Sequence, residues 1–358
     1  MSLKKWSEGG MLSREVKIYI ELAKRFDKIY FLSYGGEEEK EYRDFLAPNI
    51  EILYNKRGIN LFIYSFLAPF IHRRAMKNAD IYKTNQMLGS WTAVIAKVLF
   101  RKKLVVRQGY QLSAFSKESS IIRRIVSPLI EFFAYKIADK IIVTSQEDKD
   151  FIIERYKINE NKIIVIPNYV DTDIFKPLEV KKEKQVVFVG RLDEQKNLFS
   201  LINAVKSLDI KLVLIGNGPL EDVLRNRVKE EEIENVTFAG VVPNERLPEE
   251  LNKSEIFVLP SLYEGNPKTL LEAMACGLPV IGTNVIGIKE VITHGENGYL
   301  CGTSVESIRE AITTVMARDE LRNTIGYNAR KTILERYALD ILAKTELEIM
   351  EEMVHATR

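Results

Sequence analysis

The residues from Asn266 to Gly277 predict a short helix whose first turn is suited to binding an anion. Asn266 is a favourable N-cap, Pro267 suits the first helical position, and Gly277 would end the helix in the left-handed conformation. The first backbone N–H groups of a helix have no helical partner and lie at the positive end of its dipole. We therefore predict a phosphate site here. The amides that would form it belong to Lys268, Thr269 and Leu270.

Two carboxylates flank this helix start, Glu264 before it and Glu272 inside it. Glu272 lies within the otherwise apolar run 269–275, where a buried charge would need a partner. One interpretation is that both carboxylates bind the ligand whose phosphate lies at the helix start. The alternative is a turn-stabilising Glu264 and a capping or surface-facing Glu272, and these two positions alone leave both interpretations open.

A glycine, Gly190, directly follows the predicted buried strand 186–189, and two cations come next, Arg191 and Lys196. At the carboxyl edge of a parallel sheet a glycine lets the backbone approach a ligand. Two cations at that edge suit a diphosphate. The alternative is a pair of solvated surface charges, which the pattern does not exclude.

The elements that must position these residues are short β-branched runs that alternate with helical patterns. Most runs are continuously apolar, as strands buried on both faces must be. The alternation predicts an α/β fold with parallel sheets flanked by helices. Strands are expected at 28–34, 49–54, 103–107, 140–144, 162–166, 186–189, 211–215, 256–259 and 279–282. Helices are expected at 15–26, 91–100, 119–137, 221–231, 270–274 and 333–353.

One interruption of this alternation marks a domain boundary. It runs from Pro167 to the charged segment 181–184, after which a new strand begins. The chain has 358 residues, which suits two domains of roughly 150 to 200 residues each. We predict an amino-terminal domain over 1–170 and a second domain over 171–335, with the terminal helix, about 338–358, crossing back to the first.

Composition and charge exclude several classes of protein. A hydrophobic content of 46% with 28% charged residues is typical of a soluble globular protein. The formal charge of +2 argues against a nucleic-acid binder, although residues 1–174 carry +8 and the remainder −6. The most apolar stretches, 61–71 and 121–138, are short or interrupted by charges, so no transmembrane span is expected. The two cysteines, Cys276 and Cys301, favour a reducing cytoplasmic compartment over a disulfide framework.

The chain resembles the retaining glycosyltransferases of family 4, also called group 1. The pattern that carries the resemblance is the pair of glutamates, Glu264 and Glu272, preceded by Gly190-Arg191 and Lys196-Asn197. These enzymes have the GT-B architecture of two facing Rossmann-like domains. The resemblance is near-continuous from about residue 163 to 299 and thin over 1–160. Its supporting motifs are 166–168, 170–171, 216–219, 238–240 and 272–280.

The resemblance implies a nucleotide-sugar donor on the second domain, with UDP as the default nucleotide. Arg191 and Lys196 would neutralise the diphosphate, Glu272 would accept hydrogen bonds from the ribose, and Glu264 would contact the transferred sugar. Glu264, Arg191 and Lys196 are the predicted catalytic residues. The motif 216–219 could equally be only a tight strand-to-helix turn. The full set of predicted donor-binding residues is Gly190, Arg191, Lys196, Gly216, Gly240, Glu264, Gly265, Asn266, Lys268, Thr269, Leu270 and Glu272.

The amino-terminal half departs from the family pattern in two places. Gly9 and Gly10 resemble its glycine loop, where acceptor and donor phosphate approach the first domain, but only eight residues precede them. The usual first strand would therefore be very short, over Leu3–Trp6, or absent. Many relatives carry a histidine after the strand 103–107, whereas this chain has Gln108. A glutamine can hydrogen-bond a sugar but cannot exchange protons near pH 7.

No metal or other cofactor is expected. The three histidines, at positions 72, 294 and 355, are scattered and do not fall in motifs. Asp171 and Asp173 spell the D-x-D of a different, metal-dependent glycosyltransferase architecture. They lie in the linker between the domains, where turn chemistry is the better interpretation.

The basic excess of the first half is concentrated beside apolar helices, at Arg73-Arg74, 101–103 and Arg123-Arg124. Such helices rest on anionic membrane surfaces, where lipid-linked acceptors are found. They are equally compatible with ordinary amphipathic helices that have solvated ends. The sequence leaves both interpretations open.

The predicted function is that of a cytoplasmic, retaining, metal-independent hexosyl- or N-acetylhexosaminyltransferase. Its partners would be a nucleotide sugar and a glycan, lipid-linked or small-molecule acceptor, and not a nucleic acid. A nucleotide-sugar hydrolase or epimerase of the same fold is one alternative, and a catalytically weak subunit of a glycosyltransferase complex is another. A dinucleotide dehydrogenase is disfavoured because no G-x-G-x-x-G follows a predicted strand.

Overall fold

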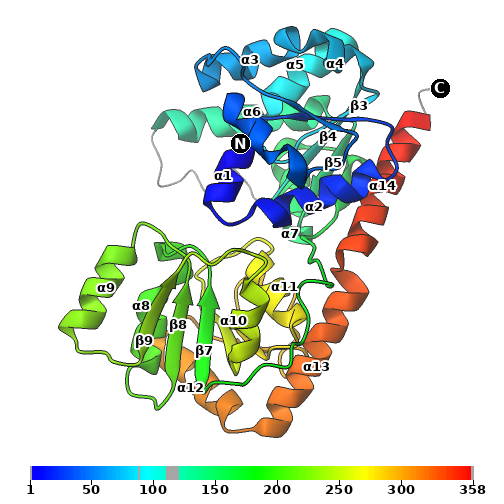
Figure 1. The fold of residues 1–358 in the computed structure, drawn as a ribbon. Helices are drawn as coiled ribbons and strands as arrows, with labels where there is room; N and C mark the ends of the chain where they lie inside the picture. Colours follow the sequence, from blue (N-terminus) through cyan, green and yellow to red (C-terminus); the bar gives the residue numbers. More distant parts are fainter. Residues whose placement is uncertain (1, 88, 110–120, 356–358) are drawn as a thin grey trace. The chain divides into compact units, whose positions relative to one another are not determined.

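The computed structural model describes residues 2–87, 89–109 and 121–355, and the side chains of 121–125 are outside this description. The chain forms two compact units (Figure 1). Unit 1 comprises Met1–Glu8, Glu15–Pro167 and Leu342–Arg358, and unit 2 comprises Gly9–Arg14 and Asn168–Ile341. The compact units thus divide at 167/168 and not at 170/171, and the short glycine-containing segment groups with unit 2. The functional assignment of the two domains stays a prediction.

Unit 2 is built on one parallel sheet of six strands, in the order β12-β11-β10-β7-β8-β9. The four central strands, β7, β8, β10 and β11, are the apolar runs that the sequence singles out, and they are almost entirely buried. The edge strands β9 and β12 are only partly buried, and β12 is missed by the search for apolar runs. The strands are β7 Gln185–Val189, β8 Lys211–Ile215, β9 Val236–Gly240, β10 Ile256–Leu259, β11 Val280–Thr283 and β12 Tyr299–Cys301.

The helices of unit 2 bury their apolar faces in a single core with this sheet. Phe188 and Phe257, from neighbouring strands, are fully buried in it, together with Leu201 and Leu271 from two helices. The predicted α/β fold, a parallel sheet flanked by helices, is therefore confirmed in this unit. The helices are α8 Leu198–Val205, α9 Glu221–Glu230, α10 Leu247–Lys253, α11 Lys268–Ala275, α12 Val305–Met316 and α13 Asp319–Arg336.

Unit 1 is also α/β, but its parallel strands form two sheets. A two-stranded sheet pairs β1 Ile29–Leu32 with β2 Ile50–Leu53. A four-stranded sheet has the order β3-β4-β5-β6, with strands Ile81–Lys83, Lys103–Gln108, Lys140–Val143 and Ile163–Val165. Its helices are α1 Leu3–Glu8, α3 Leu61–Ile71, α4 Arg73–Asn78, α5 Ser90–Phe100, α6 Ile121–Ile137 and α7 Gln146–Tyr156, while α2 Leu12–Ala23 begins among the unit 2 residues. Within the described ranges, no helix is long and apolar enough to cross a bilayer.

The expected first strand over Leu3–Trp6 is wrong, because these residues form helix α1. The carboxylate of Glu39 accepts hydrogen bonds from the backbone N–H groups of Leu3 and Lys4, at 2.9 and 3.2 Å. A carboxylate at this end of a helix satisfies amides that have no helical partner and complements the dipole. A residue more than thirty positions away thus decides the local structure.

The helix expected over 333–353 is interrupted, because α13 ends at Arg336 and α14 begins at Leu339. The backbone of Val170 forms a bridge with the residues between them: its N–H donates to Tyr337 at 2.9 Å, and its carbonyl accepts from Leu339 at 2.9 Å. These long-range bonds replace helical ones at the break.

The terminal helix α14, Leu339–His355, is attached to unit 1 by a buried carboxylate. Glu346 lies 2.9 Å from the Lys83 ammonium and 3.2 Å from the Arg107 guanidinium. Burial acts to raise the pKa of the Glu346 carboxyl, but the charges of Lys83 and Arg107 outweigh it and hold that pKa below its usual value. Residues 342–355 therefore belong to unit 1.

Candidate functional site

The carboxyl ends of three neighbouring strands of unit 2 meet at glycines. Gly190, Gly216 and Gly240 follow or end β7, β8 and β9, and Gly216 donates its N–H to the Gly240 carbonyl at 2.8 Å. Gly216 has φ +129°, and a Cβ on it would lie 2.0 Å from the Gly190 carbonyl oxygen. Only glycine fits such an approach of two backbones. The strand edge at which open α/β sheets bind ligands is therefore formed by backbone here.

Glu264 lies after β10, with its side chain only 7% exposed. Its Oε1 is paired with the Lys196 ammonium and accepts a hydrogen bond from Ser261 Oγ at 2.6 Å. Its Oε2 accepts from Gln195 Nε2 at 3.4 Å. The structure thus brings together two predicted catalytic residues, Glu264 and Lys196, as a largely buried ion pair. Ser261 and Gln195 are partners that the sequence search missed.

The loops that carry Lys196 and Glu264 are joined by backbone contacts. The Leu262 N–H donates to the Gln195 carbonyl at 2.8 Å. On the other side, Gly287 has φ +61°, and a Cβ there would lie 2.0 Å from the carbonyl oxygen of Gly265. Gly287 was also missed, because a glycine in a loop carries no local signal of what it packs against. These contacts fix the position of the Glu264 carboxylate.

The start of helix α11 differs from the prediction in two residues. The helix begins at Lys268 with Pro267 as its N-cap, so Asn266 is not the cap and Pro267 is not the first helical residue. Asn266 is instead bound to Asn168: its Oδ1 accepts the Asn168 N–H at 2.8 Å, and its carbonyl accepts from Asn168 Nδ2 at 2.5 Å. The first of these hydrogen bonds uses the side-chain oxygen that an N-cap would need. Gly277 ends the helix with φ +69°, as predicted.

The three amides of the predicted anion site nonetheless lie in the first turn of this helix. The first i→i−4 bond in α11 runs from the Leu271 N–H to the Pro267 carbonyl at 3.3 Å. The amides of Lys268, Thr269 and Leu270 precede that bond and lie at the positive end of the helix. A phosphate would find there the donors and the dipole that the sequence indicated.

Glu272, in the middle of α11, is 2% exposed and has one oxygen without a partner. Its Oε1 accepts from Arg14 Nη1 at 3.3 Å and from Asn244 Nδ2 at 3.2 Å. Its Oε2 is buried, and no described residue donates a hydrogen bond to it. Buried carboxylate oxygens are normally satisfied, so an orphaned one indicates a missing donor such as a ligand hydroxyl. The expectation that a buried Glu272 needs a charged partner is met by Arg14, 258 positions away.

Arg191 does not take part in the ion pair of Lys196 and Glu264. Its side chain is 71% exposed and lies 3.8 Å from Asp193. Of the two cations that follow β7, Lys196 contacts the buried carboxylate and Arg191 faces solvent. The two cations therefore contact different carboxylates, Arg191 that of Asp193 and Lys196 that of Glu264.

Gly10, in the predicted glycine loop, is connected to Glu272 through Asn244. Gly10 has φ +66°, and its carbonyl accepts the Asn244 N–H at 3.1 Å. Asn244 is the same residue that holds Glu272. Gly9, next to it, is exposed. The segment predicted to approach the donor is therefore linked through Asn244 to the Glu272 carboxylate.

Gln108, predicted to face the acceptor, ends strand β4 in unit 1 and is fully buried. Its side-chain oxygen accepts a hydrogen bond from the Tyr135 hydroxyl. Its Nε2 is buried, with no hydrogen-bond partner among the described residues. A donor thus remains available on this residue, and residues 110–120, which follow it, lie outside the description.

Two motifs with open interpretations have structural explanations in unit 2. Asp171 Oδ1 accepts from the backbone N–H of Asp173 at 3.1 Å, which confirms the turn interpretation. In the motif 216–219, a Cβ on Gly218 would lie 2.4 Å from the Leu192 carbonyl oxygen, so packing of the turn explains this glycine. No group of three potential metal-ligating side chains occurs in the part of the chain that the structure describes.

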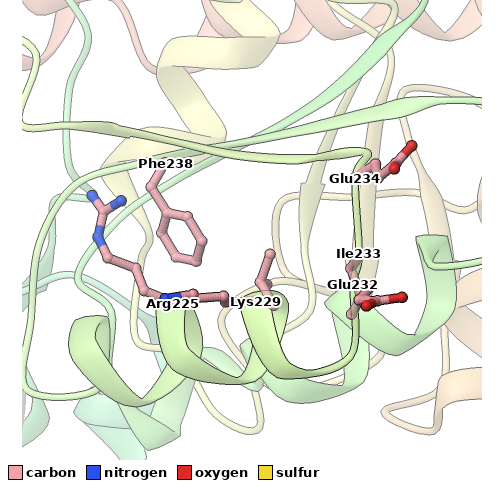
Figure 2. Close-up of a pocket in the computed structure, with 7 residues that line it drawn as sticks. Arg225, Lys229, Glu232, Ile233, Glu234 and Phe238 are labelled. Carbon is pink, nitrogen blue, oxygen red and sulfur yellow. The ribbon is translucent and has the colours of Figure 1, made fainter.

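A surface pocket lies elsewhere in unit 2, between α9 and β9. Its volume is about 650 Å³, and Figure 2 shows Phe238 and Arg225 at one end and three acidic or basic side chains along the rest. The Arg225 guanidinium lies 4.5 Å from the Phe238 ring centroid. None of the predicted site residues lines this pocket. The pocket residues are Arg225, Val228, Lys229, Glu232, Ile233, Glu234 and Phe238.

Comparison with protein families gives two matches that together span most of the chain. The model described as glycosyl transferases group 1 matches residues 169–332. The model described as glycosyltransferase family 4 matches residues 16–174. The amino-terminal half is therefore recognised as well, although its motifs are thin by eye.

Individual relatives include proteins named as glycosyltransferases and one named as a synthase. An uncharacterised glycosyltransferase of Methanocaldococcus jannaschii is 28% identical over 321 residues, 88% of each chain. The UDP-Gal:alpha-D-GlcNAc-diphosphoundecaprenol alpha-1,3-galactosyltransferase of Escherichia coli is 29% identical over 280 residues, 72% of this chain and 71% of its own. The N-acetyl-alpha-D-glucosaminyl L-malate synthase of Bacillus anthracis is 31% identical over 216 residues, 54% of this chain and 56% of its own.

Solved structures show the same fold. Sucrose-phosphate synthase from Thermosynechococcus elongatus aligns with a TM-score of 0.79 at 19% identity, over 92% of this chain and all of the other. Anabaena HepE in complex with UDP and glucose aligns with a TM-score of 0.78 at 20% identity, over 93% and 95% of the two chains. These neighbours have the GT-B fold, which confirms the predicted architecture of two Rossmann-like domains.

Proposed function

The chain belongs to glycosyltransferase family 4, the glycosyl transferases of group 1, and from this premise we propose that it is a retaining enzyme using a UDP-sugar donor. Glycosyltransferase activity on a nucleotide sugar follows from the family. The choice of UDP is supported by the names of its relatives, because the galactosyltransferase uses UDP-Gal and the HepE structure holds UDP and glucose. Retention, the hexosyl or N-acetylhexosaminyl group and metal independence are parts of the proposal.

The observation that carries the proposal is the orphaned Oε2 of Glu272. It is buried, lies one turn beyond the amide donors of α11, and belongs to a carboxylate that Arg14 and Asn244 hold in place. Ribose hydroxyls supply the donors that this oxygen lacks. The phosphates would then lie against the amides of Thr269 and Leu270 and the cation of Lys196.

The proposed reaction proceeds on one face of the donor sugar. The bond between its anomeric carbon and the β-phosphate oxygen breaks, the acceptor oxygen bonds to the same face of that carbon, and the acceptor proton passes to the leaving diphosphate. Lys196 and the α11 amides would stabilise the charge that develops on the diphosphate. Glu264 would stabilise positive charge at the anomeric carbon. Since the diphosphate takes the proton, Gln108 is compatible with activity without a histidine.

Nucleotide discrimination and turnover test this proposal together. Calorimetry with UDP, GDP and ADP should show tightest binding of UDP. Released UDP should then be followed with UDP-glucose, UDP-galactose and UDP-N-acetylglucosamine, with and without an acceptor panel that includes undecaprenyl-diphosphate-linked sugars and L-malate. Acceptor-dependent release of UDP, with the α-configuration of the donor kept in the product, supports the proposal. Equal release without acceptor indicates a hydrolase, and binding without any turnover indicates a catalytically weak subunit.

A further inference from the structure

Helix α3 of unit 1, Leu61–Ile71, exposes its phenylalanine, leucine and isoleucine side chains and buries Tyr64, Ser65, Ala68 and Pro69. Phe62 is 67% exposed and Phe70 is 55% exposed, whereas Ser65 and Ala68 are buried. This is the reverse of a helix in a water-soluble domain, whose apolar stripe faces the core. We refer to the exposed side chains as the α3 apolar face, and its members are Leu61, Phe62, Ile63, Phe66, Leu67, Phe70 and Ile71.

The α3 apolar face belongs to a helix that is held firmly from its inner side. Asn60 caps the helix, and its Oδ1 accepts the Phe62 N–H at 3.0 Å. Trp91 of α5 donates from Nε1 to Ser65 Oγ at 2.8 Å, and its ring stacks on that of Phe66 at 5.9 Å. Helices α3, α4 and α5 lie together in unit 1 (Figure 1). The exposure of the aromatic side chains is therefore a property of a packed helix with its polar and small residues inward.

The charged residues in the chain segment that holds this face are all cations. Residues 52–79 contain no Asp or Glu. They contain five cations, all exposed: Lys56 and Arg57 before the helix, and Arg73, Arg74 and Lys77 after it. An apolar face flanked at both ends by cations matches the interface of an anionic bilayer, where hydrocarbon lies beneath a layer of phosphates.

We propose that the α3 apolar face docks on the surface of an anionic membrane. The phenylalanine and leucine side chains enter the boundary between headgroups and acyl chains, and the five cations face lipid phosphates. The helix lies in the plane of the interface. A second copy of the chain is a poorer occupant, because a two-fold contact through this face would bring two sets of cations together. The inference is independent of the proposed sugar transfer.

Co-sedimentation of the full chain with liposomes tests the docking. Vesicles of phosphatidylglycerol and phosphatidylcholine should recover the chain at low salt, vesicles of phosphatidylcholine alone should recover it much less, and added salt should weaken the binding. The variant F62S/F70S should lower recovery on anionic vesicles by about tenfold, since it removes two side chains of the face. Its matched control is Tyr327→Ser, which removes a 73% exposed aromatic side chain of unit 2 and should bind like the wild type.

A second pair of variants tests the charges. R73E/R74E should abolish the difference between anionic and neutral vesicles, whereas K331E/K344E, with the same change in net charge, should keep it. Thermal unfolding and UDP binding should be unchanged in all four variants, which separates loss of docking from loss of fold or of donor binding. Equal recovery on both vesicle types, or wild-type recovery of F62S/F70S, overturns the proposal. So does a concentration-dependent dimer that F62S/F70S dissociates.

Discussion

The two units share an architecture but use their strand ends and surfaces differently. In unit 2, the glycines at the ends of β7, β8 and β9 bring backbones together at one sheet edge, and two buried glutamates lie in the loop and helix that follow β10. In unit 1, the strands divide into two sheets, and helix α3 turns large apolar side chains outward. Unit 2 thus has the features of a site for one rigid, charged ligand, and unit 1 has those of a surface for docking.

The contrast also explains why sequence motifs are dense in one unit and thin in the other. A ligand site built from backbone requires glycine at fixed positions, because a Cβ at Gly216 would lie 2.0 Å from a carbonyl oxygen. An apolar docking face requires only large apolar side chains in a helical period, which many sequences supply. Strict residue requirements leave a recognisable pattern, and loose ones do not.

The largest expected effect concerns the stability of unit 1. Replacing Glu346 by Ala would leave the Lys83 and Arg107 charges buried without their carboxylate, at a cost of about 3–5 kcal/mol in the free energy of unfolding. Chemical denaturation measures this. Glu348→Ala on the same helix removes an exposed carboxylate 3.9 Å from Lys344 and should change stability by less than about 1 kcal/mol. If both variants are equally stable, the buried cluster does not anchor α14.

The catalytic role assigned to unit 2 gives the next effect. Glu264→Gln keeps the size of the side chain and removes its charge, so it should lower kcat by on the order of 100-fold. UDP should bind at least as tightly, because Lys196 no longer shares its charge between the diphosphate and a carboxylate. Saturation kinetics paired with calorimetry test this prediction. An unchanged kcat, or loss of UDP binding, contradicts the role given to Glu264.

The second glutamate should show the opposite defect. Glu272→Ala removes the carboxylate proposed to bind ribose, so it should weaken UDP binding by about 1.5–3 kcal/mol, the range for hydrogen bonds to a charged group. The value of kcat at saturating donor should change less. Calorimetry with 2′,3′-dideoxyuridine 5′-diphosphate provides the control. This analogue lacks the ribose hydroxyls, so the variant and the wild type should bind it with the same affinity. A full affinity difference with the analogue would place Glu272 elsewhere in the site.

A smaller effect should appear in the pH dependence of stability. The pKa of Glu346 is held below its usual value in the folded protein, so its contribution is fully present above the unfolded carboxyl pKa of about 4.3. The contribution is lost as the pH falls through the lower folded value. The difference in unfolding free energy between the wild type and Glu346→Gln should therefore be constant at neutral pH and shrink in acid. A difference that grows on acidification contradicts the sign of the shift.

The smallest expected effect is that of chelation. The proposed site neutralises the diphosphate with Lys196 and the α11 amides, so EDTA should leave transfer activity within about twofold of the untreated value. Activity assays with and without added Mg²⁺ or Mn²⁺ measure this. A metal requirement that disappears in Asp171→Asn or Asp173→Asn would assign those residues a role beyond the turn that they form.

Much of unit 2 could be predicted from local sequence. The strands β7, β8, β10 and β11 are continuous apolar runs, and burial on both faces requires such runs. Gly277 ends α11 with the expected positive φ, because the left-handed position after a helix favours glycine. The predicted anion site at the start of α11 also rests only on the first few residues of the helix.

Only the tertiary structure decided which side chains meet across the chain. Leu3–Trp6 is helical because Glu39 caps it, and Asn266 is hydrogen-bonded to Asn168 and does not cap α11. Glu272 is paired with Arg14, 258 positions away. Propensity and periodicity act over a few residues, whereas a buried carboxylate takes whichever donor the fold brings within about 3 Å. Residue order along the chain therefore predicted the elements and their ends, and the packing of those elements chose the partners of each buried charge.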